Sequence, residues 1–137
     1  KTLGHQHLKE INQTLKNVQP GFSGNLYFVP WRGDFTRGIF VTSVLSCSLS
    51  QAEAAKLFND YYQGHPFTFV RDEMVDLKQV VNTNKCLINL EKIRAQLAIH
   101  SVTDNLLKGA SGQAVQNMNL MFGFPEDAGL KLKGSVF

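Results

Sequence analysis

Hydrophobic residues near the start of the chain recur every three or four positions: Leu8, Ile11, Leu15 and Val18. This spacing places them on one face of a helix, so it predicts an amphipathic helix over residues 5–18. Pro20 and Gly21 follow directly and are predicted to end it.

The pattern then changes to one typical of strands. Residues 25–47 are rich in Phe, Val, Ile and Thr, which indicates extended structure. The sequence P-W-R-G-D at 30–34 interrupts this stretch. We therefore expect the best-defined strand over residues 36–45.

A second helix is predicted from Ser50 to about Gln63. Ser50 is a natural N-cap, and Glu53 three residues later completes an S-x-x-E capping box. Gly64 is placed to end this helix.

The remaining segments predict three strands and a last helix. A short strand is expected at 67–70, and residues 72–82 permit a single helical turn. Apolar residues at 85–90 and 97–104 predict two strands that form a hairpin, with residues 91–96 as the connection.

Residues 108–112 are small and glycine-rich, and we expect them to form a loop. A final helix is predicted to start at Ser111 or Gly112 and to run to about Phe122, where G-F-P at 123–125 ends it. The element order is then α-β-α-β-β-β-α. It predicts one α+β domain over residues 1–137, with a mixed, largely antiparallel sheet and helices on one face.

Composition narrows the classes of function. The chain has 137 residues and a net charge of +3, and its Lys and Arg residues are scattered, which argues against nucleic-acid binding. No apolar run approaches the roughly 20 residues that span a bilayer. Cys47 and Cys86 are expected to be buried thiols, and no Cys/His cluster indicates a metal site. The chain begins at Lys1, which we interpret as an engineered boundary or a cleavage.

Three motifs carry a resemblance to a known family. Residues 104–119 read D-N-L-L-K-G-A-S-G-Q-A-V-Q-N-M-N, which closely resembles the D-N-L-x-K-G-A-x-G-x-A-x-Q-x-x-N segment of N-acetyl-γ-glutamyl-phosphate reductases. Residues 5–11 resemble the family's H-R-H-x-P-E-I motif, with Gln6 in place of arginine and Lys9 in place of proline. F-V-P at 28–30 and R-G-I at 37–39 resemble its F-x-P…x-R-G-I tract.

The resemblance covers the whole chain and implies a domain like the C-terminal domain of glyceraldehyde-3-phosphate dehydrogenase. The family's other domain carries the glycine-rich NADP loop and the cysteine nucleophile, and neither fingerprint occurs in this sequence. Residues 105–123 are then expected to pack against that N-terminal domain. The family also implies a cytoplasmic homo-oligomer, a dimer or tetramer, that acts in arginine biosynthesis.

The reaction that the resemblance implies is the NADP-dependent reduction of a small-molecule acyl phosphate, N-acetyl-γ-glutamyl phosphate, to an aldehyde through a cysteine thioester. Such chemistry needs a general acid/base near the thiol, and imidazole titrates in the right range. His7 and His5 are the candidates, with Glu10 one helical turn after His7 to orient its ring. Taken alone, a His-x-His near a terminus is more often a solvated or capping pair.

Two further sets of residues are candidates for binding. Arg37 or Arg32 can bind a carboxylate or phosphate through two parallel hydrogen bonds, although a sheet-edge salt bridge is the simpler interpretation. Residues 108–113 would place small side chains and free backbone N–H groups at a helix start, a suitable surface for a dinucleotide, although a tight loop and helix cap are the plain alternative. The residues for which the resemblance implies cofactor contacts are Asn105, Lys108, Gly109, Ala110, Ser111 and Gly112.

Two other hypotheses remain open at this stage. An aspartate-semialdehyde dehydrogenase would use the same mechanism on a different acyl phosphate. A non-catalytic oligomerisation module fits the same composition and element order. Arg32-Gly33-Asp34 spells an integrin-binding tripeptide, but three residues recur often by chance.

Overall fold

A computed structural model of the chain describes residues 4–134. The chain divides into two compact units, residues 1–34 and residues 35–137.

The first unit contains one helix, α1, over His7–Val18. The four apolar residues at 8, 11, 15 and 18 lie on it as predicted, and its last turn closes with a hydrogen bond from Gln19 N–H to Leu15 O at 2.8 Å. The helix starts two residues later than expected. Residues 25–34 join no strand ladder in the part of the chain described, so they are a connection and not a strand.

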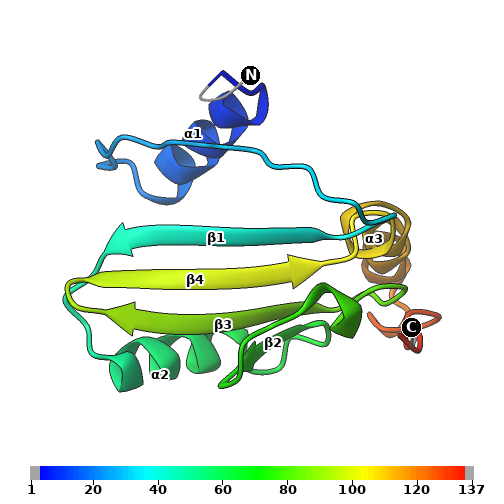
Figure 1. The fold of residues 1–137 in the computed structure, drawn as a ribbon. Coiled ribbons are helices and arrows are strands. Elements are labelled where there is room, and N and C mark those ends of the chain that lie inside the picture. The colour runs from blue at the N-terminus through cyan, green and yellow to red at the C-terminus, as the bar shows by residue number, and fades with distance from the viewer. Residues whose placement is uncertain (1–3, 135–137) are drawn as a thin grey trace. The chain divides into compact units, whose positions relative to one another are not determined.

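The second unit is built on one four-stranded sheet (Figure 1). Its strands are β1 (Ile39–Ser46), β2 (Thr68–Arg71), β3 (Cys86–Ile93) and β4 (Gln96–Thr103), in the spatial order β1-β4-β3-β2. β4 pairs antiparallel with both β1 and β3, whereas β2 and β3 are parallel. The predicted mixed, largely antiparallel sheet is confirmed.

The β3–β4 hairpin is tighter than predicted. Its ladder continues to the pair Ile93–Gln96, which leaves only Arg94 and Ala95 for the turn. Arg94 has φ = 53°, the left-handed conformation that two-residue hairpin turns require. The expectation of a connection over residues 91–96 was therefore wrong, because polar residues there continue the strands with their side chains exposed.

One face of the sheet is covered by α2 (Gln51–Tyr62), which lies alongside β3 in Figure 1. The predicted capping box is present, since Ser50 and Glu53 each bond to the other's backbone N–H. Ala54, Phe58 and Tyr62 of this helix pack against a cluster of strand residues: Ile88, Leu90, Leu97 and Ile99. This apolar contact fixes α2 on that face.

The opposite face is covered only in part. The 3₁₀ turn η1 (Leu77–Gln79) and its flanking residues Val75 and Val80 pack on Leu87 and Val102. The single helical turn expected within residues 72–82 is confirmed. Farther along β1, Phe40 and Val44 point to this face and remain exposed. Among the described residues of the second unit, no helix lies over that part of the sheet (Figure 1).

After β4 the chain forms a π-helical turn, η2 (Leu107–Ser111), and then α3 (Gly112–Phe122). The last helix is confirmed over its predicted range, and Gly123 ends it with φ = 71° in the left-handed region. The expected loop at 108–112 is instead helical, because hydrogen bonds spanning five residues extend α3 backward. Gly109 N–H donates to Asp104 O, and Ser111 N–H donates to Leu106 O.

Candidate functional site

The two candidate catalytic histidines lie side by side at the start of α1. Their ring centroids are 4.6 Å apart, and Phe28 lies 5.2 Å from the ring of His5 and 6.5 Å from that of His7. His5 Nδ1 accepts a hydrogen bond from His7 N–H, the first N–H of the helix, at 3.3 Å. The ring nitrogens of His7 have no hydrogen-bond partner among the described residues. That difference leaves His7 as the ring whose two nitrogens are both available for proton transfer.

Glu10 lies on the first turn of α1, as the predicted role requires. Its carboxylate forms no ion pair with either imidazole within residues 4–134, and its backbone oxygen accepts from Thr14 Oγ1 at 3.0 Å. An orienting role for Glu10 therefore stays a prediction. Arg32 also belongs to the first unit, where it is exposed.

Asp104 is the centre of the polar site in the second unit. Its side chain is fully buried at the end of β4, and Arg37 meets it with two nitrogens. Arg37 Nε lies 2.8 Å from Oδ2, and Nη2 donates to Oδ1 at 2.8 Å. The salt-bridge interpretation of Arg37 is thus the one observed, and substrate binding by Arg37 stays a prediction.

Asp104 also accepts three backbone hydrogen bonds. Asn82 N–H donates to Oδ2 at 2.7 Å, while Leu106 and Leu107 N–H donate to Oδ1 at 2.8 and 3.0 Å. Burial by itself raises the pKa of a carboxyl group, but the Arg37 contact and these three donors outweigh it, so the pKa of Asp104 lies below its usual value. The carboxylate is therefore a permanent anion in the folded chain at neutral pH.

This arrangement corrects one expectation about the cofactor segment. Backbone N–H groups at the start of the last helix were expected to be free for a ligand. Instead the donors of Leu106 and Leu107 face Asp104, and those of Gly109, Ser111 and Gly112 bond to backbone carbonyls. The helix N-terminus attracts negative charge, and the protein's own carboxylate occupies it.

Asn105 follows Asp104 and faces the start of β1. Its Oδ1 accepts a hydrogen bond from Gly38 N–H at 2.6 Å. Gly38 has φ = +112°, a backbone conformation that favours glycine, and an added Cβ would lie 2.8 Å from Leu77 Cδ2 and displace that side chain. Arg37–Asp104 and Gly38–Asn105 thus form two adjacent links just beyond the last strand pair, Ile39–Thr103.

The rest of the candidate cofactor segment packs on its own neighbours. Lys108 Nζ donates to Gln116 Oε1 at 3.0 Å and lies 5.6 Å from the Phe67 ring centroid. Gly112 contacts Asn84, because a Cβ at Gly112 would come within 2.2 Å of Asn84 Oδ1. Gly109 has no such restriction, with its nearest atom 3.7 Å away. Ala110 and Ser111 are exposed.

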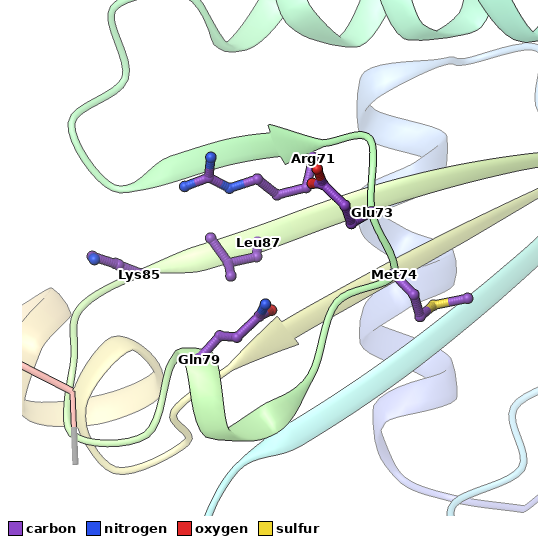
Figure 2. A pocket seen from close by; sticks show the side chains of 6 residues that line it. All are labelled: Arg71, Glu73, Met74, Gln79, Lys85 and Leu87. Atoms are coloured by element: carbon purple, nitrogen blue, oxygen red, sulfur yellow. The ribbon is translucent and has the colours of Figure 1, made fainter. Parts of the chain in front are cut away.

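A separate hollow that no motif indicated lies between β2 and η1, with a volume of about 330 Å³. Figure 2 shows Arg71 at the end of β2 and Lys85 just before the start of β3, with Glu73 and Met74 on the loop that follows β2. These are solvated side chains on an open surface. No partner for the hollow follows from them.

Two absences concern the described residues only. Within residues 4–134, no three His, Cys, Asp or Glu side chains group closely enough to bind a metal ion. None of the helices described there has the length and apolar character to cross a membrane.

Asp104 is the first residue of the motif at 104–119, but no role was predicted for it. The signal was present, because an aspartate whose side chain accepts from the backbone N–H groups two and three residues later is typical of a helix start, as Asp104 does from Leu106 and Leu107. Its pairing with Arg37, 67 residues earlier, depends on the register of β1 against β4, which no local pattern contains.

The comparison with protein families agrees with this architecture. Residues 1–105 match the family described as semialdehyde dehydrogenase, dimerisation domain. The chain belongs to this family.

Relatives with an assigned activity match over almost the whole chain. It is 55% identical over 137 residues to the N-acetyl-gamma-glutamyl-phosphate reductase of Parabacteroides distasonis, and 53% identical over 137 residues to that of Bacteroides thetaiotaomicron. The reductase of Karelsulcia muelleri is 48% identical over 129 residues, 94% of this chain. The chain spans 42% of the length of the first two relatives and 40% of the third.

Proposed function

We propose that this chain is the dimerisation and catalytic-support domain of an N-acetyl-γ-glutamyl-phosphate reductase. The observation that carries the proposal is the identity of 53–55% over all 137 residues to enzymes of that name. The geometry supports it through the His5–His7 pair on one unit and the Asp104–Asn105 site on the other. Since the chain spans 42% of those relatives, the remainder would supply the thiol and most of the NADP site.

The reaction follows from the chemistry of an acyl phosphate. A thiolate from the remainder of the protein attacks the acyl carbon, and phosphate leaves. NADPH supplies the hydride when it is bound. We propose that His7 exchanges the proton between the sulfur and the product oxygen, because both of its ring nitrogens are unpartnered, and that His5 and Phe28 fix its position.

The cofactor and substrate contacts are proposed residue by residue. The segment from Asn105 to Gly112 would meet the nicotinamide end of NADP, where Asn105 Nδ2 has no partner among the described residues. Arg32 is the better candidate for the substrate's anionic groups, because the guanidinium of Arg37 is already bound to Asp104.

The exposed side chains of Met118, Met121 and Phe122 on α3 fit contact with the NADP domain. Free Cys47 and Cys86 fit a reducing compartment such as the cytoplasm.

The test is an assay of the full-length protein. We expect NADPH oxidation with N-acetyl-γ-glutamyl phosphate, and a kcat/KM at least about 100-fold lower with β-aspartyl phosphate, since the second substrate lacks the acetamido group and one methylene. Equal or better turnover of β-aspartyl phosphate would favour the aspartate-semialdehyde dehydrogenase alternative. Binding without turnover of either would favour the non-catalytic module.

The partner of this domain is proposed to be a second copy of the chain. The family is a dimerisation domain, and the sheet face opposite α2 exposes Phe40 and Val44 on β1 with nothing of the second unit over them. Thr42 and His100 lie between them on the same face, joined at 3.0 Å. Sheet faces of this kind pack on an identical face about a two-fold axis.

Replacing Val44 with aspartate is expected to dissociate the dimer. Each two-fold interface would then bury two unpaired carboxylates, which raises the dissociation constant by at least about 100-fold. Sedimentation velocity of the full-length protein measures this. Leu45→Asp is the matched control, because Leu45 is adjacent and exposed but points to the face that carries α2. If Leu45→Asp dissociated the dimer and Val44→Asp did not, the interface would lie on the face that carries α2, and the proposed interface would be wrong.

A further inference from the structure

Strand β3 has a second neighbouring strand for only half of its length. β4 pairs with β3 from end to end, whereas β2 pairs with residues 86–89 and then leaves the sheet. The Leu90 carbonyl and the Lys92 N–H lie on the edge that β2 leaves open. Unpaired backbone groups at the edge of a sheet are a template on which another strand can pair.

The side chain of Gln51 occupies this open edge. Its Nε2 donates to Leu90 O at 2.9 Å, and its Oε1 accepts from Lys92 N–H at 2.8 Å. One residue of a parallel strand would bond to the same two backbone groups, with its N–H on the carbonyl and its carbonyl on the N–H. Gln51 is the first residue of α2, so the Ser50–Glu53 capping box that fixes the helix start also fixes this side chain at the edge.

The register of β2 on β3 identifies the residue whose place this carboxamide takes. Arg71 pairs with Asn89, so two more residues of β2 would put Glu73 directly opposite Glu91 on the same face, which is unfavourable for two carboxylates. Asn89 also holds the chain where it turns away, because its Nδ2 donates to Arg71 O at 3.1 Å and to Asp72 O at 3.0 Å. β2 therefore ends at Arg71, and a side chain completes the edge beyond it.

We propose that Gln51 closes the edge of β3 against strand addition by a second copy of the chain. A second copy is the partner to exclude, because the family is a dimerisation domain and each associating molecule carries the same open edge. An added strand would first have to displace both hydrogen bonds of the carboxamide. This role is independent of the proposed reaction and involves no cofactor.

Hydrogen exchange in the full-length protein tests whether Gln51 closes the edge. Gln51→Ala removes both hydrogen bonds, keeps the Ser50–Glu53 capping box, and introduces a residue that favours helices. We expect Lys92 N–H to exchange about 5- to 10-fold faster in this variant, the value of one hydrogen bond opened to water. Glu91 N–H points to β4, because successive backbone groups of a strand alternate in direction, and its exchange should stay within about twofold of wild type. Unchanged exchange at Lys92, or equal acceleration of both amides, would contradict the inference.

Sedimentation velocity of the full-length variants tests the exclusion of a second copy. We expect Gln51→Ala to form species larger than the wild-type oligomer, in a fraction that grows with protein concentration. Gln51→Glu should keep the wild-type size, because a charge on a sheet edge opposes strand addition and a carboxylate is favourable in the first turn of a helix. The inference would be overturned if Gln51→Ala kept the wild-type size at every concentration, or if Gln51→Glu associated to the same extent.

Gln63→Ala is the matched control for both measurements. Gln63 lies at the other end of α2, where it is exposed and its side chain forms no hydrogen bond within residues 4–134. Its replacement should change neither the exchange of Lys92 N–H nor the sedimentation, and association equal to that of Gln51→Ala would count against edge closure. None of these measurements requires turnover. Their failure therefore leaves the proposed function standing, and a wild type without NADPH-dependent turnover contradicts only the proposed function.

Discussion

Replacing His7 with alanine in the full-length protein, the proposed reductase, is expected to lower kcat by about 100- to 10,000-fold, the range that a positioned general acid/base contributes. His7 is the ring of the pair whose nitrogens have no partner in the described residues. His5→Ala is expected to cost less, about tenfold, because His5 supports His7 by accepting from its N–H and by packing beside its ring. Steady-state kinetics at saturating NADPH and acyl phosphate measures both.

The matched control for this experiment is His65→Ala. His65 is also a histidine packed against aromatic rings, Tyr61 and Tyr62, but it lies at the end of α2 in the other unit. Its kcat should equal that of wild type. If His7→Ala and His5→Ala both turned over normally, the acid/base assignment would have to be given up. A larger loss in His5→Ala than in His7→Ala would exchange the two roles.

Replacing Asp104 with asparagine is expected to destabilise the second unit by about 3 kcal/mol, the cost of breaking a buried ion pair by removing one partner. The asparagine would place an NH₂ group where Oδ2 now accepts from Asn82 and meets Arg37, so donors would face donors. Urea unfolding of the 137-residue chain measures the loss. Asp60→Asn is the control, because it breaks an ion pair of the same type that is exposed, and no resolvable change is expected.

The same carboxylate gives a pH dependence of known sign. The folded pKa of Asp104 lies below its ordinary value of 3.8. The stability it contributes is therefore fully present above that value and is lost as the pH falls through the lower folded pKa. Wild type and Asp104→Asn should differ by a constant amount above about pH 5 and converge below about pH 4. A constant difference down to pH 2 would contradict this assignment.

Local patterns in the sequence were enough for most elements of the fold. Ser50 and Glu53 predict the start of α2 because a capping box is complete within four residues. The apolar spacing from Leu8 to Val18 predicts α1 because it is also contained within one short segment. The connection at 91–96 was wrong because polar residues such as Glu91 can occupy exposed positions of a strand. The π-helical turn at Leu107–Ser111 was missed because its hydrogen bonds depend on where Asp104 is fixed.

In the candidate site, too, local patterns predicted some residues, whereas long-range contacts were missed. His5, His7 and the Asn105–Gly112 segment were found by motif. Their partners were not, since Arg37 meets Asp104 and Gly38 meets Asn105 across 67 residues. Such contacts depend on the register of β1 on β4, and a shift by one residue would turn each side chain to the other face. Long-range register is information that no short window of sequence contains.

The Asp104 carboxylate at the N-terminus of the last helical segment bears on where the proposed reductase would bind the charged part of a dinucleotide. A dinucleotide carries its negative charge on its phosphates and presents an uncharged amide at its reactive ring. On the proposed function, the amide donors of Leu106 and Leu107 are already satisfied by Asp104 and would not hold the phosphates, so this surface would meet the uncharged ring. The proposed function then requires the phosphates to be recognised elsewhere, and we expect the ionic-strength dependence of cofactor affinity to be unchanged when uncharged residues between Asn105 and Gly112 are replaced.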